Sequence, residues 1–397
     1  MIKSFTKIVR WPIETFLKME ASSGIVLALC AGLAMFTANS VWAPEYFNLL
    51  HTHILGLSLQ HWINDGLMAI FFFVIGMEIK KEILVGELST VKKAILPVAA
   101  AIGGMIFPAL IYYFFNPSAP SANGWGVPMA TDIAFALGIL TLFGKRVPLA
   151  LKIFLLALAI VDDLGAVLVI AIFYTKEIRF EGLLAATAAL GIMWFMRRMG
   201  IKSYLAYTAW GAVAWFGVLF SGVHATVAGV LIGLLTPLTF KVSRQSHLTY
   251  SPLETLVHWL HPWVSFGIMP IFALANAGIT LRGIEISELI QNPIHQGVAL
   301  GLVVGKPVGI FVFSRLSVLL RWGSLPSGIS WSHILGAGFL GGIGFTMALF
   351  ISNLALAAEF EIYSKTGIIF GSVLSGVLGS LVLAVALSSK ANSKAEV

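Results

Sequence analysis

The amino-acid sequence predicts an all-α polytopic membrane protein. Of its 397 residues, 58% are hydrophobic and 11% are charged, and the mean hydropathy is +0.93. Soluble domains carry about 25% charged residues, so this chain has too little polar surface to face water. Apolar stretches recur along almost the whole length, each long enough to cross a hydrocarbon core of about 30 Å. A single soluble domain is therefore excluded.

About twelve apolar segments are predicted to span the bilayer, within one transmembrane domain at 21–387. They are residues 21–40, 60–82, 95–115, 121–143, 150–175, 182–200, 205–220, 223–238, 255–277, 296–320, 331–354 and 362–386. Lysines and arginines alternate with apolar residues in the preceding segment 1–20, so we expect it to lie at the membrane interface. Residues 388–397 are expected to form a polar tail.

The basic residues predict the orientation of these spans. An even number of spans places both termini on one side, and that side holds 20 of the 25 Lys and Arg residues. Cytoplasmic loops are enriched in basic residues, so both termini are predicted to be cytoplasmic in a bacterial inner membrane. The net charge of +7 therefore reflects topology and not a nucleic-acid partner. The single cysteine, Cys30, excludes an internal disulfide and a cysteine metal cluster.

Three segments are expected on the external side. Residues 42–61 are rich in Leu and Ile, so we expect a short hairpin or an interfacial helix and not a bare loop. Residues 116–126 contain many helix breakers and are expected to form a loop. Residues 281–295 are expected to form the other long external loop.

Two of the predicted spans contain residues that disfavour a continuous helix. Pro128, Thr131 and Asp132 lie near the middle of 124–144, and five glycines lie within 336–344. Glycine costs a helix about 1 kcal/mol per residue. Close packing through small residues is one explanation. Because a second span is also interrupted, we favour discontinuous helices around an ion site.

Buried charges point to the chemistry of that site. The chain has four aspartates, and Asp132, Asp162 and Asp163 lie in the middle of spans, while Asp65 lies at a span end. Each central carboxylate costs about 2.5–3.5 kcal/mol on insertion. Lys306 is equally deep and precedes Pro307. A purely structural ion pair with Lys306 would explain one aspartate and leave two without a partner.

Asp162 and Asp163 are expected to have different roles. Adjacent helical residues point about 100° apart, so one can face Lys306 while the other faces a water-filled cavity. Oxygen ligands without a His or Cys cluster favour Na⁺ or Li⁺ over transition metals. If a cation and a proton compete for these carboxylates, and the site faces one side at a time, exchange follows. The residues thus predict a proton-coupled cation transporter that is not an enzyme and needs no cofactor.

Several motifs resemble the NhaA-type Na⁺/H⁺ antiporters, and together they cover nearly the whole chain. They are residues 64–82, 130–138, 158–174, 220–229, 260–278, 305–310 and 341–352. The resemblance implies inverted-topology repeats, with the fourth and eleventh spans unwound where they cross. It also implies electrogenic, pH-regulated exchange of Na⁺ or Li⁺ for H⁺, driven by the proton gradient. It further implies a homodimer joined partly by residues 42–61.

The same resemblance implies roles for individual residues. Asp163 would be the principal Na⁺ ligand and proton carrier, and Asp162 would join it after leaving its partner Lys306. Asp132 would compensate the partial positive charges of the two helix N-termini that face each other at the crossing. Lys306 would compensate the partial negative charges of the two C-termini. Thr131 would supply an oxygen near the site.

Three further residues match positions that are associated with pH response in the family. Glu78 and Glu82 are equally well explained as a solvated helix end, and His224 as a packing histidine. One departure concerns Val257, which stands where the family has a glutamate. The nearest acid, Glu254, lies about one turn earlier. The resemblance therefore does not define the pH set point of this chain.

Three other functions were weighed. An intramembrane aspartyl protease needs a Gly-x-Gly-Asp element, which none of the four aspartates has. A passive channel would not need Lys306 opposite a carboxylate pair. A sodium-coupled symporter on the same repeat architecture remains as the alternative, although no organic substrate is expected.

Overall fold

The computed structural model describes residues 13–175, 178–201, 203–238, 240–241 and 249–395. Within these ranges, helix coincides with each of the twelve predicted segments, which confirms the all-α polytopic fold class. Seven helices are long and apolar enough to span a membrane alone, and two bent pairs meet the same requirement together. The bent pairs are α2 (Ile13–Ala38) with α3 (Ala43–His51), and α17 (Trp331–Gly341) with α18 (Phe345–Ala355).

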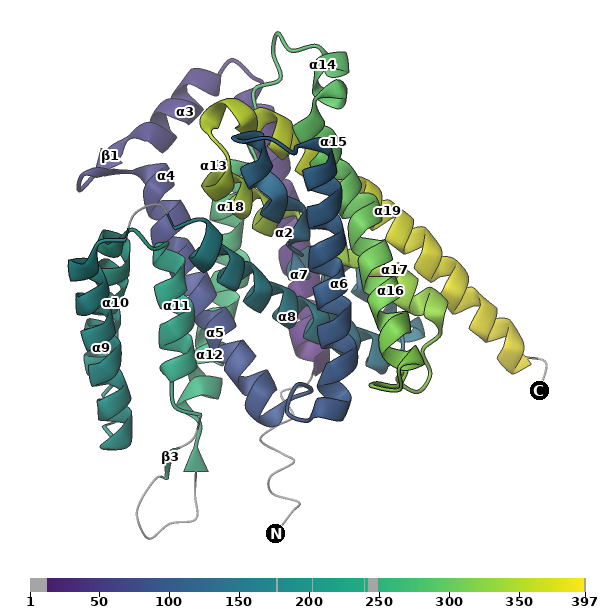
Figure 1. The fold of residues 1–397 in the computed structure, drawn as a ribbon, viewed down its shortest axis with the longest axis horizontal. Coiled ribbons are helices and arrows are strands. Elements are labelled where there is room, and N and C mark those ends of the chain that lie inside the picture. Colours follow the sequence, from purple (N-terminus) through teal and green to yellow (C-terminus); the bar gives the residue numbers. More distant parts are fainter. Residues whose placement is uncertain (1–12, 176–177, 202, 239, 242–248, 396–397) are drawn as a thin grey trace.

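The helices form two groups that pack mainly within themselves (Figure 1). The first group contains α2, η1 (Trp62–Leu67), α5 (Met68–Val85), α9 (Phe180–Arg198), α10 (Tyr204–Ser221), α11 (Ala225–Leu235), α12 (Pro252–Trp263), η4 (Val264–Ile268) and α13 (Met269–Asn276). The second contains α6 (Val91–Phe115), η2 (Ser121–Met129), α7 (Ile133–Leu142), α8 (Leu149–Phe173), α15 (Pro293–Leu300), η5 (Gly301–Gly305), α16 (Lys306–Leu319), α17, α18 and α19 (Ala358–Ala395). The groups meet where α2 packs on α7 and α5 on α8.

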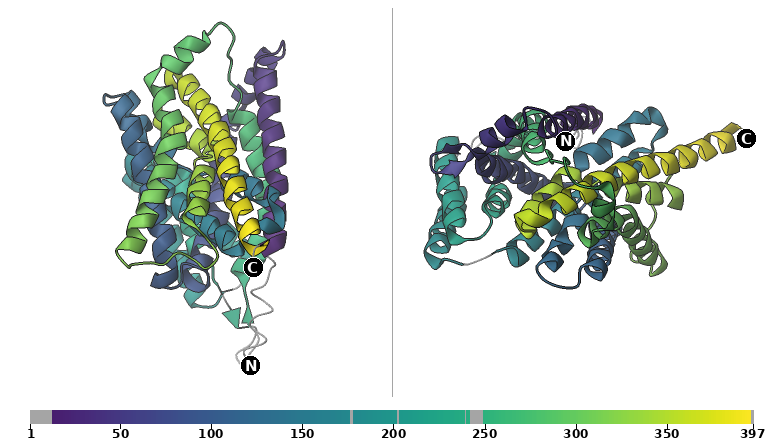
Figure 2. Two further views of the ribbon diagram at one scale, coloured as in Figure 1. Left: turned by 90° about the vertical axis from the view of Figure 1, so that its right-hand side faces the viewer. Right: turned by 90° about the horizontal axis from the view of Figure 1, so that it is seen from above.

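The two ends of the molecule are distinct. Figures 1 and 2 show that α2 begins and α19 finishes at the same end, which we call the terminal end. The short antiparallel pair of β3 (Phe240–Lys241) and β4 (Thr249–Tyr250) also lies there. The opposite end carries α3, the hairpin of β1 (His53–Ile54) and β2 (Leu57–Ser58), and α14 (Ile286–Gln291), and we call it the hairpin end.

Both structures expected for residues 42–61 occur in sequence. Helix α3 is followed by β1 (His53–Ile54), β2 (Leu57–Ser58) and the short helix α4 (Leu59–His61). The two strands pair antiparallel. The Tyr46 hydroxyl donates a hydrogen bond of 2.6 Å to the Leu274 carbonyl. This bond attaches the segment to α13, so its position is fixed by tertiary contacts.

Both predicted external loops contain helix, which corrects the expectation for each. In the segment 116–126, η2 begins at Ser121, so only its first five residues precede the helix. Two tyrosines stabilise this 3₁₀ helix, because Tyr112 donates to the Ser121 carbonyl at 2.8 Å and Tyr174 to that of Asn123 at 2.9 Å. In the segment 281–295, residues 286–291 form α14 and α15 begins at 293.

The first and last helices also differ in length from the prediction. Helix α2 begins at Ile13, so the second half of the expected interfacial segment is continuous with the first span. Residues 1–12 of that segment lie outside the described residues. Helix α19 continues to Ala395, through most of the expected polar tail, and 396–397 also lie outside the described ranges.

Three π-helical turns occur within helical runs of the described residues, and two of them precede a proline. Pro270 follows η4 and Pro307 follows η5, each at the second residue of the next helix. Proline lacks an amide N–H and its ring crowds the carbonyl four residues earlier. A wider turn at this point relieves that crowding, and such turns occur frequently at functional sites.

Candidate functional site

The two interrupted spans lie against each other at their breaks. Helix η2 ends at Met129 and α7 begins at Ile133, with extended backbone at Ala130 and Asp132 between them. The axes of α17 and α18 are bent by 47° across a break. The Asp132 amide donates a hydrogen bond of 2.6 Å to the Ile343 carbonyl, which joins the two breaks. Four helix ends therefore converge inside the protein.

The glycines of the second interrupted span serve both purposes considered above. An added Cβ at Gly338 would lie 3.1 Å from the Pro307 Cα, so this glycine allows α17 to pack closely on α16. A Cβ at Gly342 would collide with the Leu302 carbonyl oxygen, at the break itself. Close packing and helix interruption thus occur at different glycines of the same run.

Asp132 lies between two helix N-termini. Its Oδ1 accepts a hydrogen bond of 3.2 Å from the Phe135 amide, which caps α7. Its Oδ2 accepts one of 3.1 Å from the Thr346 amide in the first turn of α18, and another from the Thr346 hydroxyl. A helix N-terminus carries a partial positive charge of about +0.5. One buried carboxylate therefore faces both positive ends.

Lys306 and Thr131 lie at the opposite helix ends. The Lys306 ammonium donates to the carbonyl of Met129, the last residue of η2, and forms an ion pair with Asp162 Oδ2. The Thr131 hydroxyl oxygen lies 2.6 Å from Asp162 Oδ2 and 2.8 Å from the carbonyl of Gly341, the last residue of α17. Lys306 and Asp162 are both fully buried. The negative ends of η2 and α17 are thus each contacted by a donor.

Asp163 differs sharply from Asp162, its neighbour on α8. It lines a cavity of about 50 Å³ where the two helix groups meet. Its side chain is 7% exposed, and no hydrogen bond or ion pair joins it to another residue of the described ranges. The polar groups that share the cavity come from both helix groups: Ser23, Glu78, Thr131, Asp132, His261 and Ser265. An isolated carboxylate among oxygen ligands is suited to hold a proton or a hard cation.

The three residues associated with pH response lie in two parts of the molecule. Glu78 lines the Asp163 cavity, with Oε1 at 3.4 Å from His261 Nδ1. Glu82 lies one turn later on α5, accepts a hydrogen bond of 2.8 Å from an amide beyond the end of this helix and does not line the cavity. His224 lies toward the hairpin end, with Nε2 at 3.3 Å from Asp65 Oδ1. The structure therefore separates His224 from the two glutamates.

Some residues of the site were missed by the sequence analysis. His261 and Ser265 line the cavity from α12 and η4, and Ser23 from α2. The stretch 260–278, one of the motifs that resemble the antiporter family, contains the first two, and Pro270 could have indicated the widened turn there. Lys80 was counted only among the basic residues of the cytoplasmic side, but it is 7% exposed. Its ammonium donates to the carbonyls of Leu234 and Thr236 at 2.7 and 2.5 Å, at the C-terminus of α11.

Comparison with known proteins agrees with this architecture. The family model described as "Na+/H+ antiporter 1" matches residues 14–383 of the chain. The chain belongs to this antiporter family. A protein named "Na(+)/H(+) antiporter NhaA" from Vibrio campbellii is 49% identical over 383 residues, covering 96% of this chain and 96% of that protein. The protein of the same name from Vibrio parahaemolyticus is 49% identical, covering 96% and 98%.

A third relative from Aliivibrio fischeri, with the same printed name, is 46% identical and covers 96% of this antiporter and 99% of its own length. The similarity spans both helix groups, because the matched residues run from α2 to α19. This antiporter is accordingly a multi-pass membrane transport protein, as the composition predicts.

Proposed function

We propose that this protein exchanges Na⁺ or Li⁺ for H⁺ across the membrane, with Asp163 as the group that carries either ion. The observation that carries this proposal is the placement of the Asp163 carboxylate, buried in a cavity between two helix groups without a partner among the described residues. An ionised carboxylate in such surroundings is costly unless a positive charge compensates it. A proton and a sodium ion each supply that charge, so they compete for the same group.

Asp162, Lys306 and Thr131 complete the proposed site. In this structure the Lys306 ammonium pairs with Asp162 Oδ2, while Asp162 Oδ1 is buried and has no hydrogen-bond partner in the described part of the chain. A sodium ion at Asp163 would draw Asp162 away from Lys306 and gain a second carboxylate, with the Thr131 hydroxyl oxygen nearby. Na⁺ is the transported substrate here, bound by oxygen ligands. Two carboxylates and one lysine offer more than one proton for each cation, which would make the exchange electrogenic.

The name of the relatives supports antiport over the sodium-coupled symport that we also weighed. The cycle needs alternating access, in which the cavity opens at one end of the molecule at a time. The basic residues gather at the terminal end, so we place that end in the cytoplasm of a bacterial inner membrane. We further propose a homodimer that uses residues 42–61, and pH control that involves Glu78, Glu82 and His224.

Reconstitution into liposomes tests the exchange directly. With an imposed pH gradient and a fluorescent pH probe, addition of Na⁺ should dissipate the gradient for the wild-type protein. Asp163→Asn should abolish the response, because the amide can neither ionise nor carry a proton. A matched control is Glu285→Gln, which removes an exposed carboxylate at the hairpin end and should leave the response unchanged. Retained exchange in a folded Asp163→Asn protein would contradict the proposal.

A further inference from the structure

One face of α18 separates the Asp163 cavity from the hairpin end. Met347, Phe350 and Asn353 follow one another at three-residue intervals, so they lie along the same side of the helix. Met347 lines the cavity, and Asn353 lies nearest the C-terminus of α18, at the hairpin end. An ion that leaves Asp163 toward the hairpin end along this interface would pass these side chains in turn.

Phe350 fills the interface between the two helix groups. Its side chain is 1% exposed. Its ring centroid lies 5.4 Å from that of Phe72 in α5, 5.4 Å from that of His224 at the start of α11, and 6.1 Å from that of Phe272 in α13. These three partners all belong to the first group, whereas Phe350 belongs to the second. The ring is therefore an apolar plug that one group inserts into the other.

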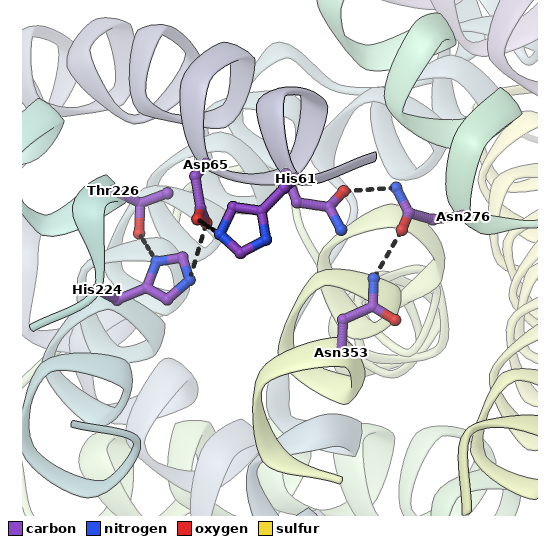
Figure 3. Close-up of polar contacts among 7 residues, drawn as sticks. His61, Asp65, His224, Thr226, Asn276 and Asn353 are labelled. Atoms are coloured by element: carbon purple, nitrogen blue, oxygen red, sulfur yellow. Dashed lines mark hydrogen bonds and ion pairs between the residues drawn. The ribbon is translucent and has the colours of Figure 1, made fainter. Parts of the chain in front are cut away.

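A chain of three asparagine amides crosses the same interface one turn farther out (Figure 3). Asn353 Nδ2 donates to Asn276 Oδ1 at 2.7 Å, from α18 to α13. Asn276 Nδ2 in turn donates to Asn64 Oδ1 at 2.8 Å and to the Phe272 carbonyl at 2.9 Å. Because Asn64 and Asn276 both belong to the first group, the bond from Asn353 is the step that joins the two groups.

We infer that the Asn353–Asn276 hydrogen bond, together with the Phe350 plug, is a latch that keeps the hairpin end of the ion path closed in this conformation. The inference rests on the proposed alternating access. The cavity and the latch lie on the same interface between the groups. Opening at the hairpin end would require the groups to separate there, which breaks this bond and withdraws the ring.

The chemistry of the latch suits a contact that must open in every cycle. Amides do not titrate, so the bond is not broken directly by the protons that the site exchanges. Asn353 Oδ1 is buried and accepts no hydrogen bond from the residues that the structure describes. A buried polar atom without a partner is unfavourable, and water that enters on opening would satisfy it. The closed state is therefore held only weakly, as a near-balanced equilibrium requires.

The charged cluster around Asp65, beside the latch, does not join the two helix groups. Asp65 is contacted by His61 Nε2 at 2.9 Å and by His224 Nε2 at 3.3 Å, and His224 Nδ1 lies 2.8 Å from the Thr226 hydroxyl (Figure 3). These residues come from α4, η1 and the start of α11, all on the side of the first group. Contacts within one group can persist when the groups separate, so this cluster is not assigned to the latch.

Thiol labelling tests the latch without relying on cation transport. Cys30→Ala removes the single native cysteine, and Met347→Cys then places a reporter between the cavity and the plug. A membrane-impermeant maleimide is added separately to each side of the membrane. Asn353→Ala should raise the labelling rate from the hairpin end several-fold relative to the reporter protein alone, because the path spends more time open at that end.

A second variant at the same position tests whether the increase comes from loss of the hydrogen bond and not from misfolding of one particular protein. Asn353→Leu nearly keeps the size of the side chain but supplies neither a donor nor an acceptor, so Asn276 Oδ1 loses its bond from this position. It cannot restore the bond, so the same increase is expected. The matched control is Ser352→Ala, which removes a buried 2.8 Å bond to Ser364 that stays within the second group. Its labelling rate should not change.

Several outcomes would overturn the latch. These are unchanged labelling in both Asn353 variants, an equal increase in Ser352→Ala, or an equal increase from both sides of the membrane. The readout does not depend on exchange, so it also separates this inference from the proposed function. If Asp163→Asn retained exchange while the Asn353 variants raised labelling, the proposed ion carrier would fail and the latch would stand.

Discussion

At the scale of single residues, two adjacent aspartates on α8 have opposite surroundings. Asp162 accepts from Lys306 and Thr131, whereas Asp163 faces a cavity without a partner in the described residues. The 100° between successive helical residues makes this possible. One carboxylate is therefore neutralised by the protein, and the other is left for the transported ion.

Lys306→Met should destabilise the protein strongly, because it leaves the Asp162 charge buried and unpaired. Removal of one partner from a buried pair costs about 3–5 kcal/mol. Thermal unfolding of the variant and the wild type in detergent measures this loss.

The matched control is Lys365→Met, which breaks a pair with Glu361 whose carboxylate is 30% exposed. Pairs that reach solvent contribute about 1 kcal/mol or less, so this variant should melt close to the wild type. An equal loss in the two variants would contradict the assignment of Lys306 to a fully buried pair.

At the scale of elements, the crossing is held by helix ends and not by side-chain packing alone. The Asp132 carboxylate accepts hydrogen bonds from backbone amides at the N-termini of α7 and α18. The Lys306 ammonium donates one to the backbone carbonyl at the C-terminus of η2. Placing opposite charges at these ends is favourable. The break in α17–α18 also needs a backbone without a side chain at Gly342, where the Leu302 carbonyl approaches.

Gly342→Ala should therefore destabilise the crossing and lower transport. A new methyl in a closely packed interior costs about 1–3 kcal/mol. The control is Gly191→Ala in α9, where nothing lies within 4 Å of an added Cβ. Alanine is favoured over glycine in helices by about 1 kcal/mol, so this control should melt at the same temperature or higher. Thermal unfolding of both proteins in detergent measures this. A Gly342→Ala protein as stable as the control would contradict the close approach of the Leu302 carbonyl to Gly342.

At the scale of the whole molecule, two helix groups meet at an interface that contains both the Asp163 cavity and the latch. If the two helix groups move relative to each other, the ion path can open at one end of the molecule while it is closed at the other end. The ion itself does not need to push the groups apart, because an ion shifts an equilibrium only by its different affinity for the two states.

Competition at Asp163 predicts how Na⁺ affinity depends on pH. A ligand that must be deprotonated binds its cation less tightly as pH falls. If one proton is displaced for each bound cation, the KM for Na⁺ should rise by up to about tenfold per pH unit in the acidic range, with little change in maximal rate. Proteoliposome transport at a series of pH values measures this. A constant KM with a falling maximal rate would argue against a shared carboxylate.

Much of the fold could be predicted from the sequence because span formation is a local property. A segment crosses the membrane when enough apolar residues follow one another, and this criterion located helices such as α6 and α8 within a few residues. The differences concern η2, whose first residues fall within one expected loop, and α14, which lies wholly within the other. Their small and polar residues are stabilised by tertiary contacts, such as the Tyr112 hydroxyl at the Ser121 carbonyl.

The unusual residues of the ion site were also visible in the sequence, because charge within an apolar stretch is itself a local signal. Asp162, Asp163 and Lys306 carry that signal, whereas His261 and Asn353 do not. A histidine near a helix end or an asparagine in a span has many ordinary explanations. Its role depends on which distant residue it meets.

The sequence alone thus determined that the chain spans the membrane and that it buries the charges for ion exchange. Only the tertiary structure decided the partners, because contacts across the two helix groups join residues far apart in the chain. Asn353 meets Asn276, and Glu78 meets His261, through the packing angle of whole helices. No local pattern specifies that angle, and it places a cavity and a latch on a single interface.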